Sequence, residues 1–398
     1  MVKLFELIPS LGNLDSVLAL GKDPHNFTVR EVDDMVLISY KRDVTNFDCD
    51  FYKYLRGMII NKDSLEVLCY GLDSKTNNDE FRKQNNFENV QVQESIDGTM
   101  VNLFYYGDSW RVSTKTMINA ADSHFYSKRS FLDLFMESKG DYDLNTLDHD
   151  YTYTFVLVHP ENRIVSNNDK CELVHVHSRN MKTFSFEKKD IGFRQPIIYD
   201  MKSYEELDNT LETLVYNNEG FMLYNKDDNS QRTKCKGKAY NMVKDLRGNQ
   251  RNNLYRILEL RKENDKKKYR EYFKFYPEFK DDDYFLSSEI KNIINDILNI
   301  YNMVKKDKVF VEIPQHLKTP IFELHQFYKE LMTEWTKKKE EQKNKNSNEE
   351  DESELRRPSI NYRGIHIYFL KLPVYKQYYL LKRNLEYKLV QNNISVSQ

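Results

Sequence analysis

A change in the spacing of apolar residues near residue 240 constrains the fold of this chain more than any other feature of its sequence. Between residues 27 and 240, Val, Ile, Thr, Tyr and Phe recur in short runs that mostly alternate with a period of two, as in β-strands. Beyond residue 240, apolar residues recur every three or four positions, as in amphipathic helices. The sequence therefore predicts an α+β chain, with a domain dominated by antiparallel sheet at residues 1–243 and a helical domain at residues 244–398.

The expected elements follow from this pattern. Strands are expected at residues 35–42, 56–71, 100–115, 151–159, 171–179 and 220–227, with 56–71 and 100–115 each forming a hairpin around a polar tip. Helices are expected near residues 122–137 and 203–215, and residues 1–20 have the apolar rhythm of an amphipathic first helix. Residues 337–357 contain one Leu and otherwise no apolar residue, which predicts a solvated or disordered linker.

Composition limits the classes of function. Charge is balanced, with 60 Lys and Arg against 62 Asp and Glu, so the whole protein does not attract nucleic acid electrostatically. A local basic groove remains compatible with that balance. No run approaches the ~20 apolar residues of a membrane span. The four cysteines are far apart and form no CxxC pair, which predicts neither a zinc site nor a disulfide framework and fits a cytoplasmic location.

Six short motifs occur in order within the first 240 residues. They are LRGMII at 55–60, ESIDGT at 94–99, VSTKT at 112–116, FVLVHPENRIV at 155–165, NEGFML at 218–223 and TKCKGKAY at 233–240. Alone, the Asp-Gly pair of ESIDGT is a hairpin signal, and the Glu-Gly pair of NEGFML is a turn that enters a strand. The ordered set is far more specific than any one of its members.

The order and spacing of these motifs resemble those of the covalent nucleotidyltransferases, the superfamily of RNA ligases, and especially the phage RNA ligases of the tRNA-repair type. The resemblance implies an ATP-grasp-like ligase domain of antiparallel sheets with a helical C-terminal domain. It also implies ATP and Mg²⁺ as cofactors, and RNA as a partner besides the nucleotide. ESIDGT resembles a variant found in proteins of large DNA viruses, so the chain looks like a divergent member that, if virus-encoded, works in the host cytoplasm.

The resemblance assigns roles residue by residue. Lys234 and Lys236 alternate on one predicted strand, so both point to the same face, and they match the lysine pair that contacts phosphate. Glu219 matches the glutamate that positions a metal ion or a lysine. The other positions that match nucleotide-contacting residues of the family are Arg56, Asp97, Gly98, Lys115, Asn162, Arg163 and Tyr240.

Two positions depart from the family pattern. Ser95 stands where the family has its nucleophilic lysine, and Val156 stands where the third motif has an acidic residue. The ligase reaction begins with attack of a neutral lysine amine on the α-phosphate of ATP, which a serine cannot reproduce without a general base. Asp97 is a conceivable base. Lys75 and Lys115 are the candidates for a replacement nucleophile.

Three functions therefore remain open. The chain is an RNA ligase-like nucleotidyltransferase, a catalytically inactive module that binds nucleotide or RNA ends, or a structural protein that reuses the fold with its helical region as an interface. Residues 261–276 interleave Lys and Arg with aromatics, which suits either RNA binding or an exposed helix face. His175 and His177 alternate on one strand, where a structural role is favoured over metal binding. His159 is a candidate to substitute for the acidic side chain that Val156 does not provide.

Overall fold

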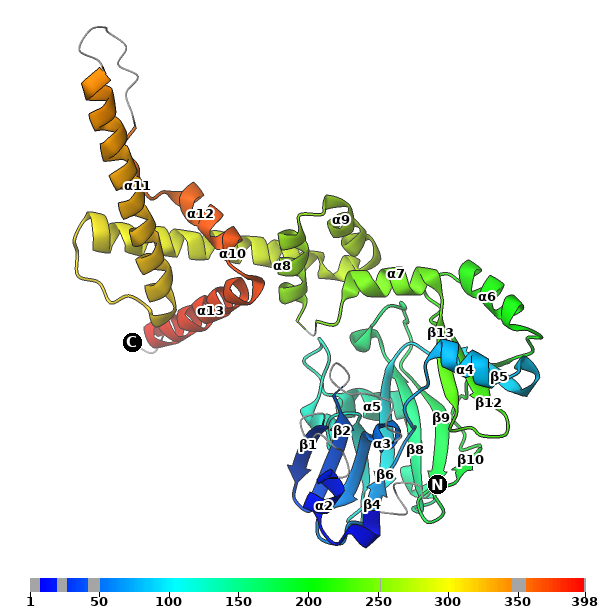
Figure 1. The fold of residues 1–398 in the computed structure, drawn as a ribbon. Coiled ribbons are helices and arrows are strands. Elements are labelled where there is room, and N and C mark those ends of the chain that lie inside the picture. The colour runs from blue at the N-terminus through cyan, green and yellow to red at the C-terminus, as the bar shows by residue number, and fades with distance from the viewer. Residues whose placement is uncertain (1–7, 20–26, 42–50, 251, 346–355, 397–398) are drawn as a thin grey trace. The chain divides into compact units, whose positions relative to one another are not determined.

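The computed structural model describes residues 8–19, 27–41, 51–250, 252–345 and 356–396 (Figure 1). The chain divides into two compact units, Met1–Arg247 and Gly248–Gln398. The first unit carries the sheets and the second is helical, so the α+β prediction is confirmed. The division lies inside the range predicted to be helical, four residues beyond the predicted boundary at 243/244.

Three sheets form the first unit, and every strand pairing in them is antiparallel. The first sheet consists, in order, of β1 (Phe27–Val32), β2 (Met35–Tyr40), β3 (Arg56–Asn61) and β4 (Val67–Cys69). The second consists of β10 (Phe186–Glu187), β9 (Glu172–Asn180), β8 (Tyr151–Val158), β6 (Thr99–Tyr105) and β7 (Trp110–Thr114). The third consists of β11 (Ile198–Tyr199), β5 (Val90–Ser95), β12 (Gly220–Asn225) and β13 (Arg232–Lys236).

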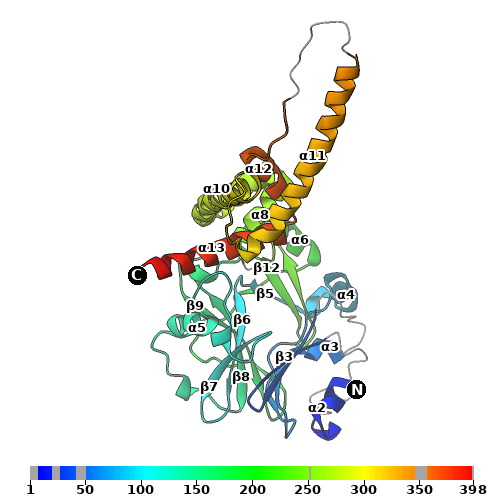
Figure 2. The same ribbon diagram turned by 90° about the vertical axis from the view of Figure 1, so that its left-hand side faces the viewer.

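Helices cover the outer faces of these sheets. The short helices are η1 (Ile8–Leu11), α2 (Leu14–Ala19), α3 (Phe51–Tyr54), η3 (Phe87–Asn89), η4 (Ala120–Asp122), η5 (Leu144–Thr146) and η6 (Pro160–Asn162). The longer ones are α4 (Asn78–Gln84), α5 (Phe131–Lys139), α6 (Tyr204–Thr213) and α7 (Lys238–Arg247). Phe135 of α5 packs against Phe155 of the second sheet. Phe81 of α4 and Leu207 of α6 share a core with Phe221 of the third sheet, whose strands β5 and β12 lie side by side in Figure 2.

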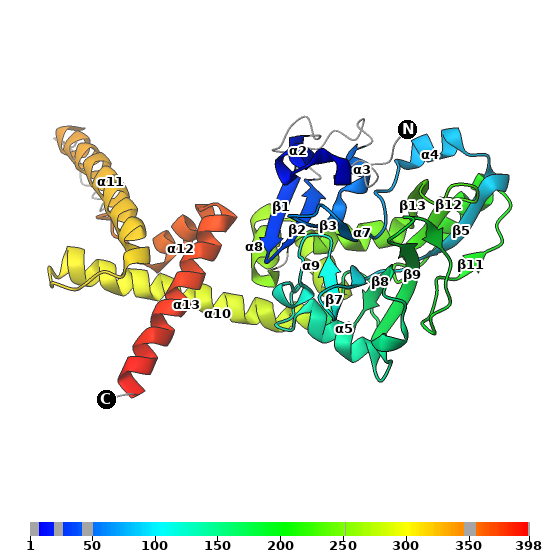
Figure 3. The same cartoon turned by 90° about the horizontal axis from the view of Figure 1, so that it is seen from below.

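Strand β2 of the first sheet is buried on both faces. Val36 and Ile38 face a core that includes Val17 of α2. Figure 3 shows α2 next to β1 and β2 of the first sheet. Met35 and Leu37 face the other way, into a core shared with strand β6 of the second sheet. This double burial explains the unbroken apolar run of β2, which a one-sided strand would not carry.

The helix predictions hold in part. α6 agrees with the expectation at 203–215 and begins at the N-cap Ser203. α5 starts only at Phe131, because Ser130 and Asp133 form a capping box that fixes the start there, and residues 123–130 are not helical. The predicted first helix is broken at Gly12, whose φ of +78° is incompatible with a continuous helix. Residues 1–7 and 20 of that prediction lie outside the described residues.

The second unit is helical throughout its regular structure, as predicted. Its elements are α8 (Asn253–Glu263), α9 (Lys266–Phe275), η7 (Pro277–Phe279), α10 (Lys280–Tyr301), the π-helical η8 (Asn302–Lys306), η9 (Gln315–Leu317), α11 (Lys318–Lys345), α12 (Tyr362–Lys371) and α13 (Val374–Val396). Helix α11 runs into the predicted linker, so residues 337–345 are helical rather than irregular. Lys, Glu and Gln are good helix formers even without apolar contacts. Residues 346–355 of the predicted linker lie outside the described residues.

The basic stretch 261–276 is used within the second unit. Arg261 forms an ion pair with Asp283 at 2.6 Å, and Lys262 donates to carbonyl oxygens at the end of α12. Tyr272 and Tyr276 are fully buried. These two aromatic rings are therefore not available for stacking on RNA bases, and their burial also differs from the exposed helix face expected as the alternative. In the described part of the chain, no helix combines the length and the hydropathy needed to cross a membrane.

Candidate functional site

A cavity of about 1090 Å³ lies in the first unit and collects most of the residues that the motifs singled out. Its basic lining residues are Arg56, Lys75, Lys115, Arg232, Lys234, Lys236 and Lys244. Its acidic lining residues are Glu80, Glu94, Asp97 and Glu219. Seven cations against four carboxylates leave a local positive surplus in a protein of net charge −2, which favours a polyanionic ligand. The volume is at the upper end for small-molecule sites.

In the third sheet, the strand register places residues from three motifs opposite one another. Gly220 of β12 lies opposite Ser95 of β5 on one side and opposite Lys236 of β13 on the other. A side chain at Gly220 would be strained and would clash, since its φ is +127° and an added Cβ would lie 2.2 Å from the carbonyl oxygen of Cys235. The glycine of the Glu-Gly pair thus lets β12 pack closely between Ser95 of β5 and Lys236 of β13.

Glu219 is the centre of this arrangement. It is buried, and its Oε2 accepts a hydrogen bond from Ser95 Oγ and one from Lys234 Nζ, both at 2.7 Å. Its Oε1 lies 2.9 Å from Lys236 Nζ. Burial alone would raise the pKa of Glu219, but the two ammonium groups reverse that effect and lower the pKa to about 2. Glu219 is therefore a permanently charged anchor for both lysines.

Ser95 therefore has a neighbouring carboxylate that the sequence did not reveal. The Ser95 hydroxyl donates its hydrogen bond to Glu219 rather than to Asp97, the base considered from the sequence. A general base works best when its pKa lies near the working pH, and a pKa of about 2 is far below it. Burial lowers the pKa of Lys234, as it does for any ammonium group, although the Glu219 carboxylate opposes this shift. The hydrogen bond to Glu219 positions Ser95 but does not activate it.

Asp97 ties two segments to the cavity wall. Its Oδ2 accepts hydrogen bonds from the backbone N–H groups of Val165 and Ser166, at 2.9 and 2.7 Å. Its Oδ1 accepts from the hydroxyl of Tyr240 at 2.7 Å. Burial and the carboxylates of Glu219 and Asp97 raise the pKa of Tyr240, which keeps its hydroxyl protonated as a donor. Asp97 thus fixes the FVLVHPENRIV loop and helix α7 to the ESIDGT turn and is not a base for Ser95.

Gly98 and Val156 contact each other directly. A Cβ at Gly98 would lie 2.5 Å from the carbonyl oxygen of Leu157 and 2.7 Å from a methyl group of Val156, so only glycine allows this approach. Val156 lines the cavity together with Ile96 and Val176, and these three belong to one apolar cluster. Where the family has an acid, this cavity has an apolar wall.

Arg56 and Lys115 bring the first and second sheets to the cavity, since Arg56 begins β3 and Lys115 directly follows β7. Gly57, next to Arg56, has a φ of +82° and touches the backbone of Lys115, so the Arg-Gly motif brings β3 against the end of β7. The Lys115 ammonium lies 4.1 Å from the ring centroid of Tyr40. Burial and the neighbouring Arg232 lower the pKa of Arg56 to about 10.

Three basic residues of the cavity lie outside the six motifs, namely Lys75, Arg232 and Lys244. Arg232 precedes Lys234 by two positions on β13, so the period-two rule for strands would have placed it on the same face. Lys244 follows Tyr240 by one helical turn, but the predicted domain boundary at 243/244 placed it in the other domain. Lys75, a candidate nucleophile from its sequence, lies in the wall between β4 and α4.

Three predicted residues lie elsewhere among the described residues. Arg163 does not line the cavity, and its guanidinium donates to the carbonyl of Val165 at 3.2 Å. Asn162 is buried and donates to Thr99 at 2.9 Å. His159 is also outside the cavity lining, so it does not substitute for an acidic side chain at position 156. The NR pair of the third motif shapes the loop that Asp97 holds.

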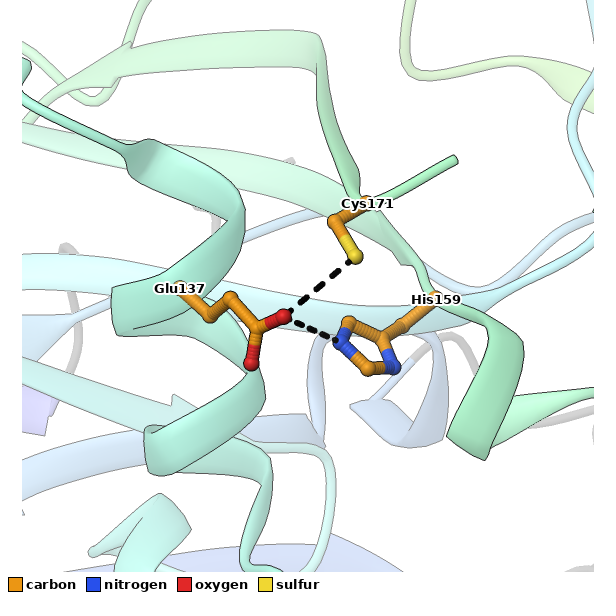
Figure 4. A group of neighbouring side chains, drawn as sticks. All are labelled: Glu137, His159 and Cys171. Carbon is orange, nitrogen blue, oxygen red and sulfur yellow. Dashed lines mark hydrogen bonds and ion pairs between the residues drawn. The ribbon is translucent and has the colours of Figure 1, made fainter. Parts of the chain in front are cut away.

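His159 faces Glu137 and Cys171 (Figure 4). Glu137 Oε1 lies 3.5 Å from His159 Nε2 and 3.6 Å from Cys171 Sγ, a donor set that could surround a metal ion. However, His159 Nδ1 accepts the N–H of Glu161, which places the proton of a neutral ring on Nε2. Partial burial and Glu137 raise the pKa of Cys171, which disfavours the thiolate. Glu137 is also paired with Arg129. The protonated Nε2, the protonated thiol and the ion pair with Arg129 therefore all disfavour metal binding by Glu137, His159 and Cys171.

His175 and His177 both lie on β9 and are buried. His175 Nε2 lies 2.9 Å from Ser178 Oγ, and burial lowers the pKa of His175 to about 4. His177 is buried, and burial lowers its pKa as well. Cys69, Cys171 and Cys235 are free thiols, and Cys49 lies outside the described residues.

Comparisons with known proteins find ligases, the class of enzyme that the motifs resemble. No protein-family model matches the chain. Over 229 residues it is 25% identical to an inferred bifunctional polynucleotide kinase/RNA ligase of Autographa californica nuclear polyhedrosis virus. That match covers 52% of this chain and 33% of the viral protein, so it spans about a third of the relative's length.

Solved structures of ligases are also similar. An inferred ATP-dependent DNA ligase from Aquifex aeolicus is 14% identical with a TM-score of 0.43, covering 78% of this chain and 87% of its own. An archaeal ATP-dependent RNA ligase is 14% identical with a TM-score of 0.41, covering 64% and 68%. A variant of Naegleria gruberi RNA ligase with ATP and Mn is 12% identical with a TM-score of 0.31, covering 38% and 51%. The chain is distantly similar to RNA and DNA ligases.

Proposed function

We propose that the first unit is an RNA ligase-like nucleotidyltransferase domain whose cavity binds ATP and a divalent cation and which acts on RNA ends. The observation that carries the proposal is that Glu219, directly before β12, contacts both Ser95 of β5 and Lys236 of β13 in a cation-rich cavity. These three residues come from three separate motifs. The distant similarity to a viral polynucleotide kinase/RNA ligase supports the same assignment.

The cavity walls differ in a way that suits a nucleotide. Lys234 and Lys236 are held in place by Glu219, so their donors are positioned before a phosphate arrives. Val156, Ile96 and Val176 provide an apolar surface on which a base or sugar can lie. A ligand with an apolar part and a polyphosphate matches this division.

A divalent cation fits this donor set only together with phosphate. Both carboxylate oxygens of Glu219 already accept from Ser95, Lys234 or Lys236, so a cation would have to displace a lysine from Glu219. Mg²⁺ commonly binds through one or two carboxylates together with substrate phosphates. When bound there, it would offset negative charge on the phosphates. Glu219 is the proposed carboxylate ligand.

A binding module without chemistry is the second candidate. Ser95 favours it, because its hydroxyl has no effective base and the lysine of the family is absent at this position. In that case the same lysines would hold the phosphates of a nucleotide or of an RNA end. Both candidates require phosphate binding, and they differ in whether a sealed RNA product forms.

The test is calorimetric titration of ATP with MgCl₂, together with anisotropy of a 5′-phosphorylated RNA. We expect the Lys234→Ala and Lys236→Ala variants each to bind ATP about 10-fold more weakly, or about 1.4 kcal/mol. Lys182→Ala is the matched control, because this lysine is exposed and paired only at the surface with Asp150. Formation of a sealed RNA would favour the ligase over the binding module. Absence of ATP and RNA binding would contradict both and favour the structural-protein alternative.

A further inference from the structure

A side compartment of about 100 Å³ adjoins the cavity of the first unit. The compartment and the cavity share four lining residues, which are Gln93, Val176, Pro196 and Tyr224. None of the described residues that line the compartment belongs to the six motifs. The compartment is therefore an extension of the cavity that motif comparison does not reach.

A shift in strand register turns His177 towards this compartment. Phe155 of β8 lies opposite His175 of β9, and the next residue of β8, Thr154, lies opposite His177. Strand β9 thus carries one extra residue between the two histidines, which is a β-bulge. Thr154 shares a face of the sheet with Val156, because side chains alternate along β8, and His177 lies opposite Thr154. His177 therefore lies on the cavity face of the second sheet, and His175 lies on the other face.

The ring nitrogens of His177 are buried and unused. The residue is 3% exposed, and neither Nδ1 nor Nε2 has a hydrogen-bond partner among the described residues. The ring contacts Phe186, with 3.5 Å between the two ring centroids. Burial, followed by the charges of Arg179 and Arg232, lowers the pKa of His177, so the neutral ring has one N–H donor and one acceptor nitrogen.

Buried polar groups of proteins are nearly always hydrogen-bonded, and unpaired ones call for an explanation. His177 lines the compartment together with Phe186. A ligand that enters the compartment from the cavity would supply the missing partner of the imidazole.

The third sheet provides further polar groups for such a ligand. Gln91, Gln93 and Ser95 share one face of β5, because side chains alternate along a strand. Gln93 Nε2 donates to Gln91 Oε1 at 2.8 Å, and this bond does not use the carbonyl oxygen of Gln93 or the amino group of Gln91. Tyr224 lies opposite Gln91 on β12 and adds an aromatic ring to the lining. The lining therefore suits a flat group that has donors and acceptors on its edge.

The compartment lies some distance from the proposed phosphate site. Strands rise about 3.3 Å per residue, so Gln93 and Gln91 lie roughly 7 and 13 Å along β5 from Ser95. Val176 lines both spaces and belongs to the apolar cluster on which a base or sugar is proposed to lie. A nucleotide with its phosphates at Lys234 would thus extend past Val176 and place the edge of its base in the compartment.

We propose that His177 hydrogen-bonds to the nucleobase of the bound nucleotide, with Gln91 and Gln93 as further partners of the base; this inference rests on the proposed binding of ATP. Adenine presents an amino donor and an acceptor nitrogen on one edge. A neutral imidazole and the two glutamine amides offer acceptors and donors for both. His177 thus distinguishes a nucleotide from a bare polyphosphate, whereas Lys234 and Lys236 bind either ligand.

The first experiment compares ATP with inorganic tripolyphosphate, which has no base, by calorimetric titration in MgCl₂. We expect His177→Leu to weaken ATP binding about 10-fold and to leave tripolyphosphate binding unchanged. His177→Gln keeps a donor and an acceptor and should hold ATP affinity within about 3-fold of the wild type. Lys234→Ala should weaken the binding of both ligands. His149→Leu is the matched control, because His149 stacks on Tyr105 outside both linings and should change neither affinity.

The second experiment observes His177 directly in the wild-type protein. The ¹⁵N resonances of its ring nitrogens, assigned by their absence in His177→Gln, should shift when ATP is added and stay in place with tripolyphosphate. A histidine with a purely structural role would not separate the two ligands in this way.

The outcomes separate this inference from the proposed function. Equal weakening of ATP and tripolyphosphate binding in His177→Leu would overturn the role of His177 and leave nucleotide binding standing. Unchanged His177 resonances at saturating ATP would do the same. A wild-type protein that binds no ATP would overturn both.

Discussion

At the scale of single residues, one buried carboxylate organises the cavity. Glu219 holds Lys234, Lys236 and Ser95 at once, and its charge is maintained by the two ammonium groups. Removing one partner of a buried ion pair leaves an uncompensated charge, which is more costly than the missing interaction alone. The stability of the first unit should therefore depend on the ionisation of Glu219.

The pH dependence of unfolding tests this role. The folded-state pKa of about 2 lies below the ordinary value of 4.5, so the stabilisation is complete above pH 4.5 and is lost as pH falls towards 2. The shift corresponds to about 3 kcal/mol. Urea unfolding between pH 2 and 6 should show this loss in the wild type and a shallower slope in Glu219→Gln. Equal slopes would show that Glu219 is not the responsible group.

Replacement of Ser95 tests whether the rest of the site is intact. In Ser95→Lys, the new ammonium would lie next to Glu219, as expected for the lysine of the ligase motif. With labelled ATP and MgCl₂, this substitution should place a covalent AMP label on residue 95. Ser95→Ala is the control and should carry no label at this residue. A Ser95→Lys variant that binds ATP and carries no label on residue 95 would mean that the cavity lacks more than its amine.

At the scale of elements, the register of β5, β12 and β13 depends on Gly220. An alanine there would combine a φ of +127° with a Cβ 2.2 Å from the Cys235 carbonyl oxygen. We expect Gly220→Ala to lower the free energy of unfolding by about 2 kcal/mol or more, measured by denaturant titration. Gly237→Ala is the matched control, since its nearest atom is 3.4 Å away. Similar losses in the two variants would contradict the strand-closure argument.

The elements could be predicted where local pattern decides them. β6, β7, β8, β9 and β12 agree with expected strands because their sequences alternate or are rich in β-branched and aromatic residues. The start of α5 at Phe131 depends on a capping box, and the break at Gly12 depends on a single positive φ, so apolar periodicity gives neither.

Motif order indicated ten cavity-lining positions, but not the direction of Arg163, because a loop side chain is oriented by tertiary hydrogen bonds. Lys244 could not be found in this way because no motif includes it.

At the scale of the whole molecule, α7 belongs to the sheet-containing unit. Leu246 and Arg247 are buried, and the Arg247 guanidinium lies 5.3 Å from the ring centroid of Phe125. A boundary at residue 243 would remove both of these residues together with Lys244. Because Met1–Arg247 forms a compact unit of its own, it should be able to fold without the second unit.

Two fragments test this boundary. We expect the fragment 1–247 to unfold cooperatively and to bind ATP with the affinity of the full chain. The fragment 1–243 should have a Tm lower by about 5 °C or more, because it loses the buried Leu246 and Arg247. Thermal unfolding followed by circular dichroism gives both values. Equal Tm values would place the end of the unit before α7 is complete.

The central claim is that the cavity of the first unit is a nucleotide site. Its most direct test is a crystal structure of the protein with a non-hydrolysable ATP analogue and MgCl₂. We predict that the triphosphate contacts Lys234 and Lys236, with its α-phosphate next to Ser95. An analogue bound outside this cavity, or a cavity left empty at saturating analogue, would contradict the claim.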